Sequence, residues 1–405
     1  MTAAWLNNSY LQQVLRVHYQ SDEVQVKSVN LETALGRGEN YGAILTRIRV
    51  VYKWGDSQVD YVDFIMAKTE LENEDFDTRE RKAPYDIFNR ELDIYENVMP
   101  RLQELANEQI CPKIYHIDRQ HRALLMEDLS MQGYKMASRL NRLDEQHVRI
   151  VLNKLAKMQA ASVIMQAETQ SLNRFDRGFF NQYTESFQTY FVGCLRACAE
   201  YLQSQPGYKE SAVLLEQLAP HYMSLGLRCF RPEEDQINVL THGDLWTNNM
   251  MFKYENNVPI DVLLIDFQYA FWGSPTLDIH HLINTSAIEC VRSGKQMEMR
   301  CVYYKTFREQ IKRLQFKGKW SSSLKKFHLA SEQKRFYAVH CGLILQPVLL
   351  NTDETDADFA ALLSDKPRGI NMKRRLYLNE AIQDSVKTLV KQFELEGLLE
   401  PEQYV

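Results

Sequence analysis

Residues 240–249 read LTHGDLWTNN, and residues 263–268 read LLIDFQ. In the first segment Asp244 precedes Asn249 by five positions, and in the second Asp266 ends a short apolar run that predicts a buried strand. A carboxylate within reach of an attacking hydroxyl can orient that hydroxyl and accept its proton. Carboxylate and amide oxygens are also the ligands that Mg²⁺ prefers. These residue types therefore predict Asp244 as a catalytic base, and Asn249 and Asp266 as magnesium ligands.

The order and spacing of these three residues match the catalytic loop and the metal-binding aspartate of kinases. Either segment alone could be a chance turn or an ordinary strand end, because short sequence matches are often accidental. Their occurrence together, each beside a short apolar run, is much harder to explain by chance. The two segments therefore predict an ATP-dependent phosphotransferase.

A positive charge for the phosphates of ATP lies nearer the N-terminus. Residues 41–54 and 61–68 are rich in β-branched and aromatic side chains and predict a β-hairpin, whose second strand ends at Lys68. Beyond Pro84, apolar residues recur at helical spacing, and Glu91 falls on the inward-facing stripe of this helix. A buried carboxylate is costly unless it is paired, so we predict an ion pair between Glu91 and Lys68. Each residue alone would more often be an ordinary surface charge.

Two further segments are candidates for contact with the nucleotide. Residues 36–42 read GRGENYG, which offers backbone N–H groups and little side-chain bulk, as a loop that covers phosphates requires. Residues 127–129 lie at the predicted lobe boundary, where a hinge backbone would meet the adenine. A glycine turn is usually a plain hairpin, and any strand-to-helix connection would look similar to the second segment. The residues assigned to nucleotide binding are Gly36, Gly38, Asn40, Gly42, Glu127 and Leu129, together with Lys68 and Glu91.

The predicted strands and helices divide the chain into three parts. Residues 1–30 are predicted to form an N-terminal helical segment, and residues 31–130 a small, β-rich lobe that binds the nucleotide. Residues 131–405 are predicted to form a larger, mostly helical lobe that holds the catalytic loop and the substrate-binding helices. Asp144 is the predicted N-cap of the first long helix of that lobe. The predicted fold class is α+β, with a two-lobed, protein-kinase-like fold.

Composition and net charge indicate which kinds of partner the protein binds and in which cellular compartment it works. The chain is 45% apolar and 25% charged, as in an ordinary globular protein, and its net charge of -5 offers no basic field to attract nucleic acid. No apolar run reaches the ~20 residues that a membrane span requires. The seven cysteines are scattered without a C-x-x-C pair, which is typical of reduced thiols. We therefore expect a cytoplasmic protein that does not bind nucleic acid and does not span a membrane.

Several segments together resemble one family. The segments HGDLWTNNM and LLIDFQ, preceded by GRGENYG, FIMAK, FNRELDIY and MEDL, resemble the insect ecdysteroid kinase-like family, which is related to choline kinases and aminoglycoside phosphotransferases. The resemblance extends from about residue 31 to the late 380s. It implies a kinase-like fold, ATP and Mg²⁺ as cofactors, and the roles given above for Lys68, Glu91, Asp244, Asn249 and Asp266.

The resemblance also implies which residues support the catalytic loop. Asp278 resembles the buried aspartate that holds this loop in the family, with His242 as a further supporting residue. By spacing alone, Asp278 could equally be the N-cap of a helix. Related proteins commonly have a histidine where this chain has Gln159. This departure weakens the expectation that the helix around Gln159 supports the site.

The expected acceptor is a hydroxyl group of a small molecule. The resemblance suggests an ecdysteroid or another lipophilic alcohol, and a choline-like amino alcohol is the alternative. A protein kinase is disfavoured because Gly243 stands where many protein kinases have an arginine, and because few residues separate Asp266 from Asp278. A catalytically inactive binding protein would have no physical need for the complete set of predicted site residues.

The acceptor is expected between Asp244 and the helices beyond Asp278. The aromatic residues between positions 179 and 191 could form core or pocket, and their mixed helical spacing favours core. Tyr269 and Trp272 follow Asp266 closely and could face either a steroid or a cationic amine.

Overall fold

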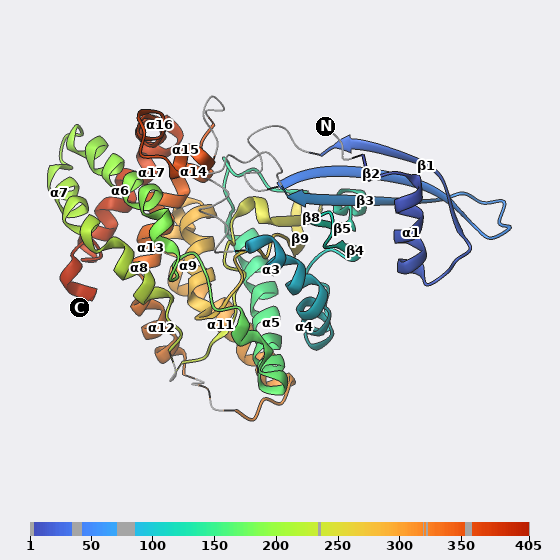
Figure 1. Ribbon diagram of the computed structural model, residues 1–405. Helices are drawn as coiled ribbons and strands as arrows, with labels where there is room; N and C mark the ends of the chain where they lie inside the picture. The colour runs from blue at the N-terminus through green and yellow to red at the C-terminus, as the bar shows by residue number, and fades with distance from the viewer. Residues whose placement is uncertain are drawn as a thin grey trace.

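The computed structural model describes residues 4–34, 43–70, 86–233, 236–318, 320, 323–352 and 359–404. These residues form a small region built on a β-sheet and a larger, mostly helical region (Figure 1). We call them the small lobe and the large lobe. This arrangement confirms the predicted α+β class.

The small lobe is a five-stranded antiparallel sheet with one helix against it. Its strand order is β1-β2-β3-β5-β4. The strands are β1 (Val24–Thr33), β2 (Ala43–Trp54), β3 (Tyr61–Glu70), β4 (Ile114–Asp118) and β5 (Ala123–Glu127), and helix α1 spans Asn8–Tyr19. Leu11 and Leu15 of α1 share a hydrophobic core with Ile48 and Ile65 of the sheet. The predicted hairpin corresponds to β2 and β3, whereas β1 begins at Val24, inside the segment that was expected to be helical.

The helix predicted beyond Pro84 is present, and its geometry changes along its length. Helix α3 (Ile87–Asp93) continues through a wider π-helical turn at Ile94–Val98 into α4 (Met99–Ala106). The irregular turn directly precedes Pro100, which has no N–H to donate and crowds the preceding turn. Apolar residues of this helix belong to the core of the large lobe, where α4 packs against α5 (Glu145–Thr169).

The large lobe places short strands beside the small lobe and helices farther away (Figure 1). A three-stranded sheet has the order β6-β8-β9, and β7 pairs with β10. A 3₁₀ turn, Leu129–Gln132, joins the lobes, and Asp144 caps α5 by accepting a hydrogen bond from His147 N, as predicted. The strands are β6 (Tyr134–Met136), β7 (Val239–Leu240), β8 (Met250–Glu255), β9 (Val258–Leu264) and β10 (Trp272–Gly273). The helices after α5 are α6 (Gln188–Gln203), α7 (Lys209–Leu218), α8 (Tyr222–Phe230), α9 (Pro275–Ser286), α10 (Glu289–Gly294), α11 (Gln296–Arg313), α12 (Leu324–Gln333), α13 (Phe336–His340), α14 (Gln346–Leu349), α15 (Phe359–Leu363), α16 (Pro367–Leu378) and α17 (Glu380–Leu395).

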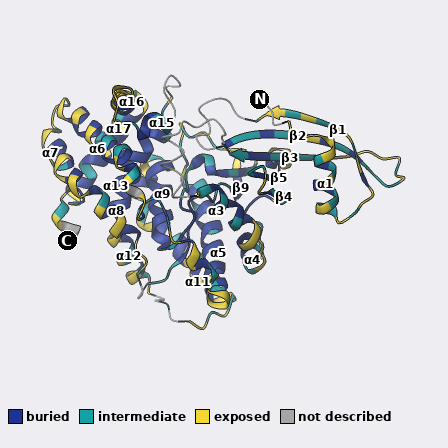
Figure 2. Cartoon of the chain, in the orientation of Figure 1, coloured by how far each residue is buried: buried dark blue, intermediate teal, exposed yellow. Residues whose placement is uncertain are grey.

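Helix α9 is buried along its whole length (Figure 2). It packs against α5, α10, α12, α13 and α14. Several of its side chains are nevertheless polar, and buried polar groups need hydrogen-bond partners. Those partners include the catalytic loop, which ties this helix to the candidate site.

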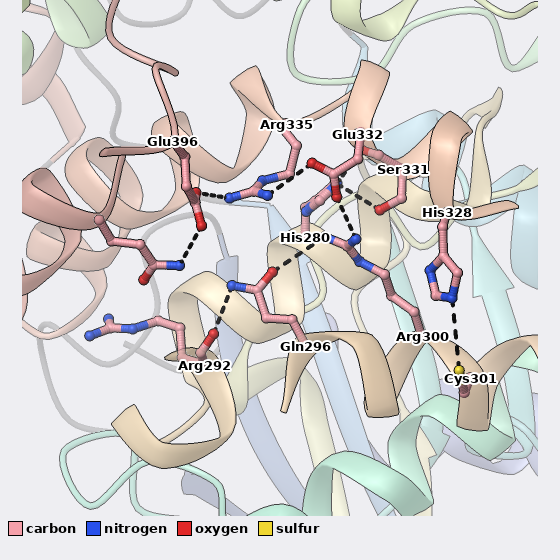
Figure 3. Close-up of polar contacts among 11 residues, drawn as sticks. His280, Arg292, Gln296, Arg300, Cys301, His328, Ser331, Glu332, Arg335 and Glu396 are labelled. Carbon is pink, nitrogen blue, oxygen red and sulfur yellow. Dashed lines mark hydrogen bonds and ion pairs between the residues drawn. The ribbon is translucent and has the colours of Figure 1, made fainter. Parts of the chain in front are cut away.

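Charged side chains connect α11, α12 and the end of α17 (Figure 3). Glu332 of α12 accepts hydrogen bonds from Arg300 of α11, at 2.6 Å, and from Arg335, at 3.0 Å. Arg335 also donates to Glu396, just after α17. His280 of α9 lies 2.9 Å from the carbonyl oxygen of Ser331. These contacts fix α9 relative to α11, α12 and α17.

No helix among the described residues is long and apolar enough to cross a membrane.

Candidate active site

The catalytic loop runs between β7 and β8 and turns sharply at Gly243. The φ angle of Gly243 is +83°, in the left-handed region that side chains disfavour. A Cβ atom at this position would lie 2.0 Å from the carbonyl oxygen of Tyr269. Only glycine fits, which gives a structural reason for the absence of the arginine found in many protein kinases.

Asp278 holds this turn from helix α9. Its carboxylate accepts hydrogen bonds from the backbone N–H groups of His242, at 2.7 Å, and Gly243, at 2.9 Å. Burial raises the pKa of Asp278 to about 7, although these two hydrogen bonds oppose the shift. Ser274 is the N-cap of α9, so Asp278 is not the cap, which was the alternative left open by the sequence.

Gln159 supports the same carboxylate from α5. Its amide nitrogen donates to Asp278 at 2.7 Å, and its amide oxygen accepts from the hydroxyl of Tyr303 at 2.6 Å. The departure from the histidine of related proteins therefore does not remove the contact of this helix with the site. A glutamine amide can donate a hydrogen bond, as a neutral imidazole can. The residue type at position 159 was therefore compatible with this contact. Ser286, which accepts a hydrogen bond from Thr247 N at 3.0 Å, was not predicted.

Asp244 and Asn249 face each other across the loop. The amide nitrogen of Asn249 donates to the backbone oxygen of Asp244 at 2.8 Å and to its Oδ2 at 3.0 Å. Because this nitrogen is directed at Asp244, the amide oxygen is the atom of Asn249 left to contact a cation. Burial, together with the charge of Asp266, raises the pKa of Asp244 to about 7. His242 donates from Nε2 to the carbonyl oxygen of Ile265 at 3.0 Å, and burial lowers its pKa to about 4.

Lys68 lies between two carboxylates, as an ion-pair partner of both. Its Nζ is 2.6 Å from Glu91 Oε2 and 3.2 Å from Asp266 Oδ1. Burial alone would lower the pKa of Lys68, but the charges of Asp266 and Glu91 outweigh it and raise the pKa to about 12. Lys68 therefore stays charged, and the predicted Lys68–Glu91 pair is present. Asp266 follows β9 with a φ of +67°, a strained conformation typical of functional positions.

A single cleft with a volume of about 270 Å³ is lined by Lys68, Glu91, Asp244, Asn249 and Asp266. Its nucleotide end, as we name it, is formed by Leu45, Met66, Met126, Glu127 and Leu129 on β2, β3, β5 and the lobe connection. The carboxylate of Glu127 accepts hydrogen bonds from Lys113 N, at 2.8 Å, and Gln109, at 2.7 Å. The predicted phosphate-covering residues Gly36, Gly38, Asn40 and Gly42 lie outside the described residues.

The opposite end of the cleft, the acceptor end, is apolar and aromatic. It is lined by Phe179, Phe187, Tyr190, Tyr269, Leu345, Val348, Leu349, Phe359 and Leu362. The predicted aromatic cluster is therefore divided: Phe187 faces the cleft, whereas Phe180 and Phe191 are buried in the core. Of the two aromatic residues after Asp266, Tyr269 lines the cleft and Trp272 packs against the core instead.

The cleft provides the donor set that Mg²⁺ requires when it is shared with a nucleotide. Asn249 and Asp266 contribute an amide and a carboxylate, and both line the cleft beside Lys68. No group of three or more His, Cys, Asp or Glu side chains suited to a metal occurs among the described residues. Mg²⁺ is commonly held by one or two protein oxygens completed by phosphates and water, so this sparse set fits it.

Comparison with known proteins agrees with this geometry. A model of the ecdysteroid kinase-like family matches residues 37–316, which include the predicted site residues except Gly36. The chain belongs to the ecdysteroid kinase-like family. It is accordingly a phosphotransferase of the small-molecule kinase class with a kinase-like fold. The family match ends before α12, whereas the resemblance was expected to continue to the late 380s.

Solved structures similar to this ecdysteroid kinase-like protein share little sequence with it. They include an ethanolamine kinase from Plasmodium vivax, with 15% identity, a TM-score of 0.45 and coverage of 93% of this chain and 89% of the other. A choline kinase from Cryptosporidium parvum has 13% identity, a TM-score of 0.44 and coverage of 97% and 99%. A GDP complex of aminoglycoside 2'-phosphotransferase-IIIa has 11% identity, a TM-score of 0.43 and coverage of 97% and 99%. No curated protein matches the chain.

Proposed function

We propose that this protein uses ATP and Mg²⁺ to phosphorylate a hydroxyl group of a small lipophilic molecule, with steroid alcohols such as ecdysteroids as the first candidates. One observation carries the proposal. Lys68, Asp244, Asn249 and Asp266 line the same cleft, and the wall beyond Asp244 is apolar and aromatic. Residues 31–130 would bind the nucleotide, and residues 131–405 would supply the catalytic loop and the acceptor site.

The proposed chemistry is an in-line transfer to an alcohol. Asp244 orients the acceptor hydroxyl and takes its proton, while the oxygen attacks the γ-phosphorus of ATP and ADP leaves. Lys68, kept charged by its two carboxylate neighbours, binds the α- and β-phosphates. Asn249 and Asp266 would hold Mg²⁺, which supplies neutralisation of the phosphate charge when bound. Asp278 and Gln159 keep the loop in place for this step.

The acceptor end of the cleft favours an uncharged, lipophilic acceptor. Its walls consist of aliphatic and aromatic side chains, and such surfaces gain free energy by removing apolar groups from water. Among the described residues of this wall there is no acidic side chain to pair with a choline-like cation, although Tyr269 could still contact it through its ring. The amino-alcohol kinase is therefore the second candidate.

The seven cysteines, all within the described residues, are free thiols. We infer from this a reducing compartment, which agrees with a cytoplasmic enzyme that draws on ATP.

Two measurements test the proposal in sequence. First, Mg-ATP should raise the melting temperature of the protein, because a ligand that binds the native state stabilises it. Second, phosphoryl transfer should be measured against steroid alcohols, choline-like amines, aminoglycosides and a peptide library. Asp244→Asn is the control, and we expect it to bind Mg-ATP but to lose about 10²–10⁴-fold in turnover. Phosphorylation of peptides alone would refute the small-molecule assignment, and absence of any nucleotide binding would favour an inactive binding protein.

A further inference from the structure

A buried histidine that the proposed mechanism does not use lies behind Asp244. The side chain of His281, on α9, is 1% exposed, and its Nε2 atom is 3.5 Å from Asp244 Oδ1. Within the part of the chain that the structure describes, Nε2 forms no hydrogen bond. A buried polar atom without a partner is costly, so its direction toward the proposed base requires an explanation.

The other ring nitrogen of His281 identifies the tautomer. Nδ1 lies 2.8 Å from the hydroxyl of Tyr337. Burial lowers the pKa of His281 to about 3, so the ring is neutral and has one donor and one acceptor nitrogen. Asp244 must be ionised to act as a base, and in that form a proton on Nδ1 of His281 would leave the lone pair of Nε2 facing the carboxylate, which would repel it. The favoured arrangement has Tyr337 donating to Nδ1 and the proton on Nε2, directed toward Asp244.

His281 is one of three α9 residues that contact successive parts of the catalytic loop. Asp278 accepts from the backbone N–H groups of His242 and Gly243, and Ser286 accepts from Thr247 N. Positions 278 and 281 are about one helical turn apart and are neighbours on the helix surface, and Ser286 is the last residue of α9. Along the loop, Asp244 lies between these two contact points, so α9 contacts the loop at its start, at Asp244 and at Thr247.

We propose that His281 is a positioning residue for Asp244, with its Nε2–H holding the Oδ1 atom of the base, and that Tyr337 fixes the tautomer that makes this possible. The inference rests on the proposed function, in which Asp244 is the base. A separation of 3.5 Å is at the long limit for a hydrogen bond, and such contacts at catalytic sites often shorten when substrate binds.

Two donors would then hold the two oxygens of Asp244 from different elements. Asn249 donates to Oδ2 from the catalytic loop itself, and His281 would donate to Oδ1 from α9. Together they restrict rotation of the carboxylate about its side-chain bond. This arrangement has the logic of a catalytic base that is oriented by a third group. Because His281 is not among the residues that line the cleft, its removal should lower kcat and leave the KM for ATP unchanged.

The test compares two substitutions of similar size at position 281. His281→Gln places an amide donor near the position of Nε2, whereas His281→Leu fills the space without a donor. We expect His281→Leu to lower kcat about 10–100-fold, with normal stabilisation by Mg-ATP, and His281→Gln to recover most of that loss. Tyr337→Phe should give an intermediate kcat, because the ring remains but its tautomer is no longer fixed. The acceptor is the best alcohol from the panel described above.

The other outcomes are equally informative. Wild-type kcat in His281→Leu would overturn the proposal, as would an equal loss in the Gln and Leu variants together with a lowered melting temperature, which indicates packing alone. Asp244→Asn is run in parallel: if it kept full activity, the proposed function would fail, and the assignment of His281 with it. Should the variants not fold, ¹⁵N NMR of histidine-labelled wild-type protein decides, because a proton on Nδ1 instead of Nε2 of His281 contradicts the proposal.

Discussion

Two residues of the candidate site have backbone conformations in the left-handed region. Gly243 combines a left-handed backbone with a carbonyl group where a side chain would begin. Asp266, which lies beside Lys68, has a similar φ although its side chain disfavours that conformation. The surrounding structure must stabilise both conformations, and the hydrogen bonds that the loop N–H groups donate to Asp278 do so for the first.

Two glycines with nearly equal φ angles allow two effects of a Gly→Ala substitution to be measured separately. One is the free-energy cost of the left-handed backbone, and the other is the cost of a steric clash of the new Cβ atom. Gly207 has a φ of +82°, and a Cβ atom there would have no other atom within 4 Å, whereas Gly243 has the tight contact with Tyr269. We expect Gly207→Ala to lose about 1–2 kcal/mol of unfolding free energy and to keep its activity. Gly243→Ala should lose more and be inactive. Urea unfolding and a turnover assay measure both, and equal losses of stability would contradict the role of the Tyr269 carbonyl.

Magnesium dependence tests the two proposed ligands. Asn249→Ala and Asp266→Ala should weaken binding of Mg-ATP more than binding of metal-free ATP, because the partner of each side chain is the cation. Calorimetric titrations with and without magnesium compare the two affinities. The ligand assignment fails if each variant loses the same factor under both conditions.

The sequence predicts Asp244, Asn249 and Asp266 as site residues because their spacing is typical of a kinase catalytic loop, and the structure brings all three to one cleft. Asp244, Asn249 and Asp266 lie in short segments whose order matches one reaction type. The contacts of Ser286 and His281 could not be found in this way, because they depend on how α9 packs against a loop more than 30 residues away. Pairing across such a distance is a tertiary property that local pattern does not encode.

At the scale of elements, the charged contacts of Figure 3 join helices that are distant in sequence. Arg300 and Arg335 are nearly buried, and Glu332 is the carboxylate they share. Although partial burial tends to raise the pKa of Glu332, the two arginines lower it below its usual value. A folded-state pKa below the unfolded value means that ionised Glu332 stabilises the folded protein above the unfolded pKa, and that this stabilisation is lost as the pH falls.

Glu332→Gln should therefore lower the unfolding free energy at pH 7 by about 1–2 kcal/mol. The difference from wild type should shrink as the pH falls below the unfolded pKa of about 4.3. Glu200→Gln is the matched control, because Glu200 pairs with Arg374 between α6 and α16 where both side chains are half exposed. Its effect should be close to zero. Thermal unfolding across this pH range measures both variants, and a pH-independent difference for Glu332→Gln would contradict the linkage.

Elements with a strong periodic pattern were the most predictable. Strand β3 begins at the predicted residue, Tyr61, and α5 starts after the predicted cap. Strand β1 was not predicted because many of its residues are polar and exposed, so only pairing with β2 stabilises it as a strand. The helix beyond Pro84 was predicted, but the π-helical turn before Pro100 was not, because it depends on how the chain restores its hydrogen bonds.

At the scale of the whole molecule, one cleft joins two chemically different surfaces. The nucleotide end is lined from the small lobe and the lobe connection, and the acceptor end from α6, α14 and α15. The two-lobed arrangement was predictable from the order of strands and helices. The extent of the acceptor end was not, since it is assembled from segments separated by more than 150 residues.

A reciprocal pair of substitutions tests this division of the cleft. Leu45→Ala, on β2, should weaken ATP binding and leave the KM of the acceptor unchanged. Phe359→Ala, on α15, should raise the KM of a lipophilic acceptor and leave ATP binding unchanged, because each change removes apolar contact area at one end only. Calorimetry with ATP and acceptor kinetics measure the two effects. If both variants altered the same ligand, the assignment of the two ends would be wrong.

The attachment of α3 has a consequence for how the cleft opens. Arg90 donates to the carbonyl oxygens of Arg177 and Ala270, and Phe88 and Leu92 belong to the large-lobe core. Ile65 and Ala67, the buried neighbours of Lys68 on β3, belong instead to the separate core between the sheet and α1. A rotation of the sheet would therefore carry Lys68 away while Glu91 stayed behind. Each exchange of ADP for ATP would then require electrostatic work to separate two opposite charges that lie 2.6 Å apart. The Lys68–Glu91 ion pair would therefore favour the closed form of the cleft over the open form.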